Sequence, residues 1–375
     1  MHKENTRSDK NTSNKIAAVD LFCGAGGLTR GLKDAGIDVK LGIDFDDNFR
    51  RTYETNNKPA YFYRADIKTL SGIDLERMLS IDPHELFLLA ACTPCQPFSR
   101  HIKTHRYDRR KSLLLDVIRI IDEFNQKPDF ILLENVPRIM KIDNGRILNN
   151  FLKRIENYGY NYKAEVVDAK NYGVPQTRKR FIMLAIRKDL YAEAILFPSK
   201  THGKGLSPYK TVRETIERLP RLRAGQYHDA VLNHECAKIS ELNLKRLNYV
   251  PKNGGSRMSW PKELVLDCHI DHEGHKDVYG RMKWDAPSPT LTCKCISISN
   301  GRFGHPSQLR GISLREAALL QTFPENYEFF GMFRNMAAQI GNAVPVHLAK
   351  IFGEYLINLP VGKKLNTYSA KQGGQ

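Results

Sequence analysis

The sequence predicts an α/β fold, a doubly wound and mostly parallel sheet, together with a second, smaller and loop-rich domain. Short apolar runs alternate with helical runs from about residue 16 to residue 187. This alternation then stops, and residues 190–305 are rich in Pro, Gly, His, Lys and Arg. Two more helical runs follow, at 314–321 and 346–355. Strands and helices that alternate at this spacing predict parallel strands covered by helices on both faces.

The expected strands are short apolar runs bounded by polar or turn residues, which is typical of strands buried in a sheet. The first helix should begin after the glycines at 24–27 and end near Gly36, because glycine permits the left-handed conformation found at helix ends. In chain order, the strands are expected at 16–22, 39–43, just before Asp66, 86–91, 130–133, 163–168 and 181–186, and the helices at 28–35, 47–56, 75–79, 113–124 and 147–158.

The composition indicates a nucleic-acid partner. Lys and Arg outnumber Asp and Glu so far that the 375 residues carry a formal net charge of +17. Such an excess is typical of proteins that bind a polyanion, although a lysine-rich surface with no such partner is the alternative. The length suits two domains. We expect a disordered tail at 1–14, one domain made of 15–189 and 306–360, and a second domain at 190–305.

The sequence also indicates where the protein acts. Residues 1–15 are polar and charged, so no secretory signal is expected. No apolar run approaches the roughly 20 residues that a membrane span needs, so no membrane partner is expected. The 7 cysteines are scattered and odd in number. This usage predicts free thiols in a reducing cytoplasm.

A glycine-rich turn separates the first expected strand from the first helix. Residues 20–28 read Asp-Leu-Phe-Cys-Gly-Ala-Gly-Gly-Leu, and such glycines let a ligand approach the backbone and the free N–H groups of the helix. Asp44 and Asp66 follow the next two strands, where carboxylates suit ribose hydroxyls and an adenine amino group. The turn fits neither the phosphate loop nor the dinucleotide fingerprint cleanly, so without the aspartates a plain strand-to-helix turn would be favoured.

A cysteine and a glutamate follow two apolar strands. Cys95 lies between Pro94 and Pro97, and the prolines hold its thiol on a stiff loop after the strand. Glu134 ends the strand that begins at Phe130, where desolvation can keep a carboxyl group protonated. A thiol nucleophile beside a protonated carboxyl suits addition to an electron-poor double bond. For Glu134 alone, an ion-paired carboxylate is the alternative.

A basic segment precedes the last expected strand. Residues 176–180 read Gln-Thr-Arg-Lys-Arg, and in an extended segment Arg178 and Arg180 would point the same way. Two such arginines can grip phosphates or the polar edge of a base. A solvated basic loop is the alternative.

Together, and in this order, these patterns resemble the DNA (cytosine-5) methyltransferase family. The similarity covers nearly the whole chain apart from the tail and the middle of the second domain. The family's Phe-x-Gly-x-Gly-Gly, Pro-Cys-Gln, Glu-Asn-Val and Gln-x-Arg-x-Arg motifs, with its ninth and tenth motifs, match residues 22–27, 94–96, 134–136, 176–180, 315–324 and 339–345.

The resemblance implies a Rossmann-like, class I methyltransferase fold with S-adenosylmethionine at the C-terminal edge of the sheet. Phe22 would touch the adenine, Asp44 the ribose and Asp66 the adenine amino group. Asp44 stands where many relatives carry glutamate, and either carboxylate can accept from a ribose diol. The residues expected at the cofactor are Phe22, Gly24, Gly26, Gly27, Asp44, Asp66, Ile67, Pro94, Asn342 and Val344.

The resemblance also implies the catalytic roles. A cytosine is flipped out of duplex DNA, Cys95 attacks its carbon 6, and protonated Glu134 holds ring nitrogen 3. Arg180 would bind the base carbonyl oxygen and Arg178 a phosphate. Carbon 5 then takes the methyl group of S-adenosylmethionine. No metal is expected at this site.

Double-stranded DNA is the expected partner, and residues 190–305 are expected to recognise the target. The loop after Cys95 is basic and suits phosphate contact, but it has no glycine between Ser99 and Lys111, where family loops commonly carry some. A monomer is expected, with any cognate restriction endonuclease acting separately. The expected DNA contacts are Gln96, Ser99, Arg106, Arg109, Arg110 and Arg257.

Other interpretations stay open from sequence alone. A tRNA cytosine-5 methyltransferase shares these motifs, but the Cys-Phe-Thr tripeptide of that branch is absent. A DNA-binding regulator that has kept the fold without catalysis is a second alternative. Cys92 and Cys95 have the spacing of a redox pair or half a zinc site. Cysteines and histidines between 268 and 295 form a further zinc candidate, although their spacing matches no standard pattern.

Overall fold

The structure is a computed structural model that describes residues 14–94, 113–270 and 277–361. Residues 1–13 of the expected tail lie outside these ranges. Asn14, which the prediction assigns to the tail, is attached to the fold, because its Nδ2 donates to the carbonyl oxygens of Leu356 at 3.2 Å and Leu359 at 2.9 Å. Among the described helices, none has the length and apolar character required to cross a membrane.

The centre of the molecule is one seven-stranded sheet with the order β3-β2-β1-β4-β5-β7-β6. The first five strands run parallel, as expected. β7 is antiparallel to both of its neighbours, because only residues 169–178 join it to β6 and so short a link cannot carry a parallel crossover. The strands are β1 (Ile16–Leu21), β2 (Asp38–Asp44), β3 (Tyr61–Arg64), β4 (Leu86–Cys92), β5 (Phe130–Asn135), β6 (Tyr160–Asp168) and β7 (Lys179–Arg187).

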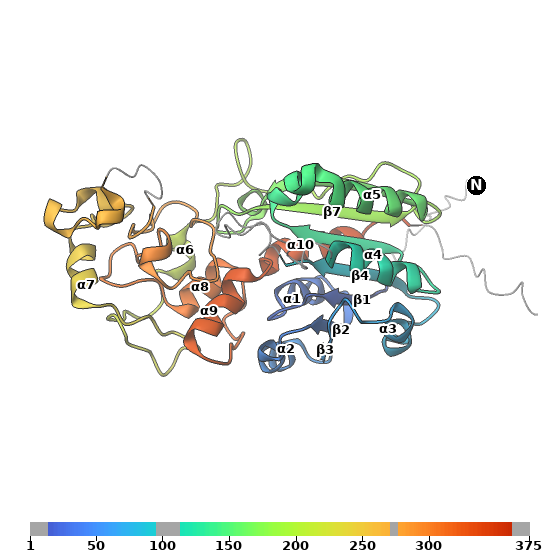
Figure 1. The fold of residues 1–375 in the computed structure, drawn as a ribbon, viewed down its shortest axis with the longest axis horizontal. Coiled ribbons are helices and arrows are strands. Elements are labelled where there is room, and N and C mark those ends of the chain that lie inside the picture. The colour runs from blue at the N-terminus through green and yellow to red at the C-terminus, as the bar shows by residue number, and fades with distance from the viewer. Residues whose placement is uncertain (1–13, 95–112, 271–276, 362–375) are drawn as a thin grey trace, which may run out of the picture.

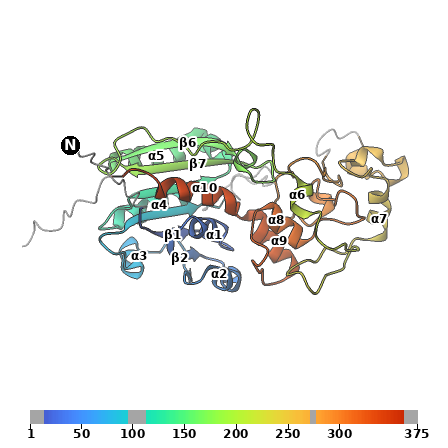
Figure 2. The same cartoon turned by 180° about the vertical axis from the view of Figure 1, so that it is seen from behind.

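Helices cover both faces of this sheet, so the doubly wound prediction is confirmed. Alternate residues of β1 point to opposite faces: Ala18 joins the core under α1 and α10, and Val19 joins the core under α3, α4 and α5. Figure 1 shows α4 and α5 in front of the sheet, and the reverse view in Figure 2 shows α10 there. These helices are α1 (Gly27–Asp34), α3 (Gly72–Leu79), α4 (Leu113–Glu123), α5 (Arg146–Asn157) and α10 (Val346–Ile357), while α2 (Arg50–Asn57) lies between β2 and β3 in sequence.

A second group of helices lies beside the sheet rather than over it (Figures 1 and 2). It comprises α6 (Val212–Ile216), α7 (Glu241–Asn248), α8 (Leu314–Leu320) and α9 (Phe333–Asn342). One apolar core unites α6, α8 and α9 with residues such as Met282 and Phe303. Only α10 returns to the sheet. The sequence-based boundary at residue 305 therefore falls within this core, which also contains Ala25 and Val346 from the expected first domain. The assignment of domains by function stays a prediction.

Candidate functional site

The sheet brings the predicted motifs to one edge. β1, β2, β4 and β5 are parallel and in register, with Leu21 beside Ile43 and Ala91, and Cys92 beside Glu134. The segments that follow these strands therefore emerge together. β7 runs the other way, so its first residues lie at the same edge, with Phe181 beside Asn135.

The three glycines of the turn after β1 have different surroundings. A Cβ placed on Gly24 would meet no atom within 4 Å, so this glycine borders open space. A Cβ on Gly26 would come within 2.4 Å of Asn57 Nδ2, and one on Gly27 within 2.6 Å of the carbonyl oxygen of Val344. Gly26 and Gly27 thus allow the turn to pack against α2 and the segment after α9, and Gly24 is the one suited to a ligand.

The carboxylates that end β2 and follow β3 lie next to that turn. Asp44 Oδ2 accepts a hydrogen bond from Gly24 N at 3.0 Å, and its Oδ1 accepts one from Asp46 N at 3.0 Å. Burial is the main cause that raises the pKa of Asp44. Asp66 Oδ1 accepts from Lys68 N at 3.1 Å. Ile67 beside it is buried at 3% exposure, so its side chain belongs to the core under α3 and α4.

An aromatic residue that the sequence analysis does not single out stands beside Asp44. Phe45 is 64% exposed, and the Arg64 guanidinium carbon lies 6.0 Å from the centre of its ring. Phe22, the predicted adenine contact, is half-buried and has a φ of 62°, an uncommon conformation for a bulky residue. An aromatic residue directly after a strand-end carboxylate is the sequence signal that could have identified Phe45.

Asp20, at the start of the glycine-rich motif, is fully buried behind the turn. Its Oδ2 accepts hydrogen bonds from Thr29 N at 3.1 Å and Thr29 Oγ1 at 2.7 Å. Its Oδ1 is buried without a hydrogen-bond partner. Burial raises the pKa of Asp20 to about 7, although the two Thr29 hydrogen bonds act in the opposite direction. This carboxyl group therefore changes charge near neutral pH inside the fold.

Glu134 has partners on both neighbouring strands and is 5% exposed. Arg180 Nε on β7 donates to Glu134 Oε1 at 2.9 Å, and Cys92 Sγ on β4 donates to Oε2 at 2.9 Å. The ion-paired carboxylate, which the sequence left open as the alternative for Glu134, is the arrangement in this structure. The sequence predicted that Glu134 and Arg180 act at one site, and the structure does bring them together.

Asn135 fixes the chain just ahead of the predicted nucleophile. Its Nδ2 donates to the carbonyl oxygen of Thr93 at 3.1 Å, and its Oδ1 accepts from Val136 N at 2.8 Å. Asn135 is 1% exposed, so its amide lies fully inside the fold. Pro94, half-buried, is the last described residue of this segment.

Arg178 does not lie where the sequence analysis expected it. Its side chain is buried at 2% exposure. Nη1 donates to the carbonyl oxygen of Leu291 at 2.8 Å, and Nη2 donates to those of Gly341 at 3.2 Å and Ala343 at 3.0 Å. The expected contact with a DNA phosphate is thus wrong for this conformation. Arg178 instead ties the start of β7 to two distant segments of the chain.

Of the other residues predicted to bind DNA or the cofactor or to act in catalysis, the structure describes only some. Arg257 is buried at 7% exposure, so its predicted place on a DNA-binding surface is wrong here. Asn342 is exposed at the end of α9, whereas Val344 is buried against the glycine turn. Residues outside the described ranges are the predicted nucleophile Cys95 and the predicted DNA contacts Gln96, Ser99, Arg106, Arg109 and Arg110.

The zinc candidate in the second half of the chain receives no geometric support. Cys268 and Cys293 are exposed, and Cys295 is buried with its Sγ 3.8 Å from the carbonyl oxygen of Ala337. His272 and His275 lie outside the described residues. Within the part of the chain that the structure describes, no three His, Cys, Asp or Glu side chains are grouped to hold a metal ion.

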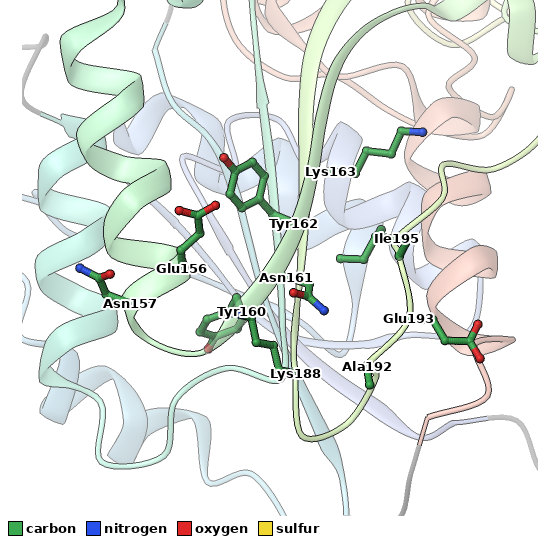
Figure 3. A pocket seen from close by; sticks show the side chains of 11 residues that line it. Glu156, Asn157, Tyr160, Asn161, Tyr162, Lys163, Lys188, Ala192, Glu193 and Ile195 are labelled. Carbon is green, nitrogen blue, oxygen red and sulfur yellow. The ribbon is translucent and has the colours of Figure 1, made fainter.

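A polar pocket at the opposite edge of the sheet contains none of the predicted site residues (Figure 3). It lies where β6 begins and β7 has ended. Its lining includes Glu156 from α5, Tyr160 and Lys163 from β6, and Lys188 and Glu193 from the segment after β7. The candidate site is therefore the edge that carries the motifs, and not this pocket.

Comparisons with known proteins agree with the motif order. A sequence model of the family described as C-5 cytosine-specific DNA methylase matches residues 16–358. The chain is 39% identical to the Type II methylase M.HgiDII of Herpetosiphon aurantiacus over 345 residues, which is 90% of this chain and 94% of the relative. It is 30% identical to the Type II methyltransferase M1.HphI of Haemophilus parahaemolyticus, over 92% of this chain and 87% of the relative.

Solved structures share the fold. A crystal structure of a candidate DNA modification methyltransferase encoded within a prophage of E. coli superposes with a TM-score of 0.72 at 22% identity, covering 92% of this chain and 99% of that one. The structure of the S. pombe Dnmt2 methyltransferase gives a TM-score of 0.62 at 20% identity, covering 92% and 98%. At these identities the similarity concerns the fold alone.

Proposed function

We propose that this chain, which belongs to the C-5 cytosine-specific DNA methylase family and is therefore a DNA (cytosine-5) methyltransferase, uses S-adenosylmethionine at the edge described above. The observation that carries the proposal is the Glu134–Arg180 pair, set at the sheet edge that also holds the glycine turn and Asp44. A base-binding acid and a cofactor loop must share one edge for methyl transfer between them.

The residues at this edge fit S-adenosylmethionine. The open space at Gly24 permits close approach of a ligand to the backbone. Asp44 would accept from the ribose hydroxyls, Asp66 from the adenine amino group, and the exposed Phe45 offers an apolar ring beside them. Phe22, Gly26, Gly27, Ile67, Pro94, Asn342 and Val344 complete the proposed pocket, with Gly26, Gly27 and Ile67 acting through packing. When bound, S-adenosylmethionine supplies the electrophilic methyl group that carbon 5 of the base takes up.

Catalysis by the protein's own residues begins with a flipped cytosine, whose extrusion costs a few kcal/mol. The Cys95 thiolate adds to carbon 6, and the electron pair displaced from the ring double bond makes carbon 5 nucleophilic. A proton on Glu134 is donated to ring nitrogen 3, which keeps the ring from accumulating negative charge. After carbon 5 is methylated, its proton passes to water and the bond between carbon 6 and sulfur breaks, which releases the thiolate. Ring nitrogen 3 returns its proton to Glu134, and the enzyme is restored.

The ion pair between Glu134 and Arg180 supports a route by which Glu134 becomes an acid. Arg180 turns from Glu134 Oε1 to the carbonyl oxygen of the arriving base. A carboxyl group that loses its guanidinium partner in a desolvated pocket takes up a proton. Arg180 thus pairs with the Glu134 carboxylate before the base binds and contacts the carbonyl oxygen of the base afterwards.

The remaining assignments concern partners. The net charge of +17 suits duplex DNA, and residues 190–305 are proposed to read the target sequence. Because the similar proteins named above include Type II methyltransferases, we propose that a separate restriction endonuclease recognises the same site. Action as a monomer in the bacterial cytoplasm completes the proposal.

Bisulfite sequencing of plasmid from a host that expresses the protein tests this function. Methylated cytosines at one recurrent sequence are expected with the wild-type protein, and none with Cys95→Ala. A tritium-transfer assay with DNA and tRNA side by side separates the RNA alternative. DNA binding without any methylation would favour the regulator, and methylation by Cys95→Ala would overturn the mechanism.

A further inference from the structure

Cys92 contacts the catalytic carboxyl group directly. It is the last residue of β4 and lies beside Glu134 of β5 in the parallel register. Its Sγ is 2.9 Å from Glu134 Oε2. The other carboxyl oxygen, Oε1, is bound by Arg180 Nε at 2.9 Å. Each oxygen of Glu134 therefore has its own donor, and the two donors come from opposite sides of β5.

The two donors differ in how they can move. Arg180 ends a long side chain at the start of β7, and the proposed mechanism requires its guanidinium to turn to the base. Cys92 has a single side-chain torsion for its sulfur, and its backbone is fixed in the sheet between β1 and β5. When Arg180 turns away, the thiol still contacts the carboxyl group.

We propose that Cys92 is a positioning residue that holds Glu134 Oε2 while Glu134 exchanges its ion pair for a proton. The proposal rests on the proposed function, because it concerns the same reaction. A thiol is a weak donor, so it orients the carboxyl group without strongly favouring its charged form. A hydroxyl group would hold the charged form more firmly, and a methyl group would not hold it at all.

Charged and titratable groups contact Glu134 from both neighbouring strands. Within the described residues these are Arg180 from β7 and Cys92 from β4. A change at Cys92 should therefore appear in the pH dependence of turnover. Since the protonated form of Glu134 is the active one, activity falls at the alkaline side as that proton is lost.

Two substitutions of Cys92 should shift the alkaline fall in kcat in opposite directions. Cys92→Ser keeps the side-chain shape with a stronger donor, so the alkaline fall in kcat should move to lower pH by about 0.5 unit. Cys92→Ala removes the donor, so the alkaline fall should move to higher pH by a similar amount. Because the carboxyl group is then less well oriented, kcat at the optimum should also drop about tenfold.

The test measures kcat from pH 6 to 10 with tritiated S-adenosylmethionine, saturating duplex DNA and a reducing agent. Lys153→Ala, at an exposed position of α5, is the control and should keep the wild-type profile. Thermal unfolding of each variant confirms that it is folded. Shifts of opposite sign for Ser and Ala support the positioning role. Equal losses of activity with unshifted profiles would overturn it, and an inactive wild-type protein would instead refute the proposed function.

Discussion

Arg180 Nε lies 2.9 Å from Glu134 Oε1, and this contact joins antiparallel β7 to parallel β5. If β7 ran parallel to β5, residues 176–180 would lie at the opposite edge of the sheet. The direction of one strand thus places an arginine beside the carboxyl group that the proposed mechanism uses. The same reversal brings the segment before β7 against residues 288–291.

Arg180→Ala should abolish most of the methyl transfer. The substitution leaves the Glu134 carboxylate buried without its guanidinium partner and removes the proposed donor to the base. Loss of one such donor costs roughly 10²- to 10³-fold in kcat. Arg180→Lys keeps the charge without the planar fork, so an intermediate loss is expected. Lys179→Ala, at the exposed neighbouring position, is the control and should retain kcat at saturating DNA.

Arg178→Ala should act on stability rather than on DNA affinity. Three backbone carbonyl groups that now accept from Arg178 would lose a buried donor, at a cost of about 3 kcal/mol or more in the free energy of unfolding. Urea denaturation measures this loss. Under conditions in which the variant is folded, the salt dependence of DNA binding should match that of wild type. A slope lower by about one would instead indicate a phosphate contact.

Alanine at two glycines of the turn should have different consequences. In Gly27→Ala the new Cβ would lie 2.6 Å from the carbonyl oxygen of Val344, so a loss of about 2 kcal/mol in stability is expected. Gly24→Ala meets no atom within 4 Å and has a φ of +50°, so about 1 kcal/mol is expected. Calorimetry should show the larger loss of S-adenosylmethionine affinity in Gly24→Ala. The reverse ranking would mean that Gly24 does not border the cofactor.

Asp20→Asn should remove a pH dependence of stability. The pKa of Asp20 is raised from 3.8 to about 7 in the folded state, so its favourable contribution is complete below about pH 4 and is lost as the pH rises to 7. The amide is neutral throughout. The free energy of unfolding of Asp20→Asn, relative to that of wild type, should therefore increase between pH 4 and 8 by on the order of 3 kcal/mol. Urea midpoints at both pH values measure this, and parallel curves would contradict the raised pKa.

The sequence predicted the strands, the helices on both faces and the meeting of the motifs at one edge, because apolar periodicity and glycine turns are local signals. The direction of β7 was not predictable in the same way. An apolar run of that length predicts a strand, but it does not indicate whether the strand runs parallel or antiparallel to its neighbours. The helix α9 was also missed. Its buried positions pack against residues far away in the sequence, such as Met282 and Phe303.

Two arginines show why side-chain placement was less predictable. Arg178 and Arg180 were expected to point the same way, but β7 begins at Lys179, so strand alternation does not extend to Arg178. That residue lies in a segment whose Thr177 N donates to the carbonyl oxygen of Ser288 at 2.9 Å. Arg257 is buried at the start of a short 3-10 helix, Arg257–Ser259, and nothing in its neighbouring residues marks it as internal. The placement of Arg178 depends on contacts with residues more than a hundred positions away in the chain.

Covalent catalysis by Cys95 is tested most directly by trapping the intermediate. The protein is incubated with S-adenosylmethionine and a duplex oligonucleotide that carries 5-fluorocytosine at the target site, and the crosslinked peptide is identified by mass spectrometry. Fluorine at carbon 5 blocks the proton loss that precedes elimination of the thiolate, so the adduct should persist. Covalent catalysis by Cys95 requires that the oligonucleotide is attached to Cys95. Attachment to a peptide without Cys95, or no adduct from a preparation that methylates the unmodified duplex, would contradict it.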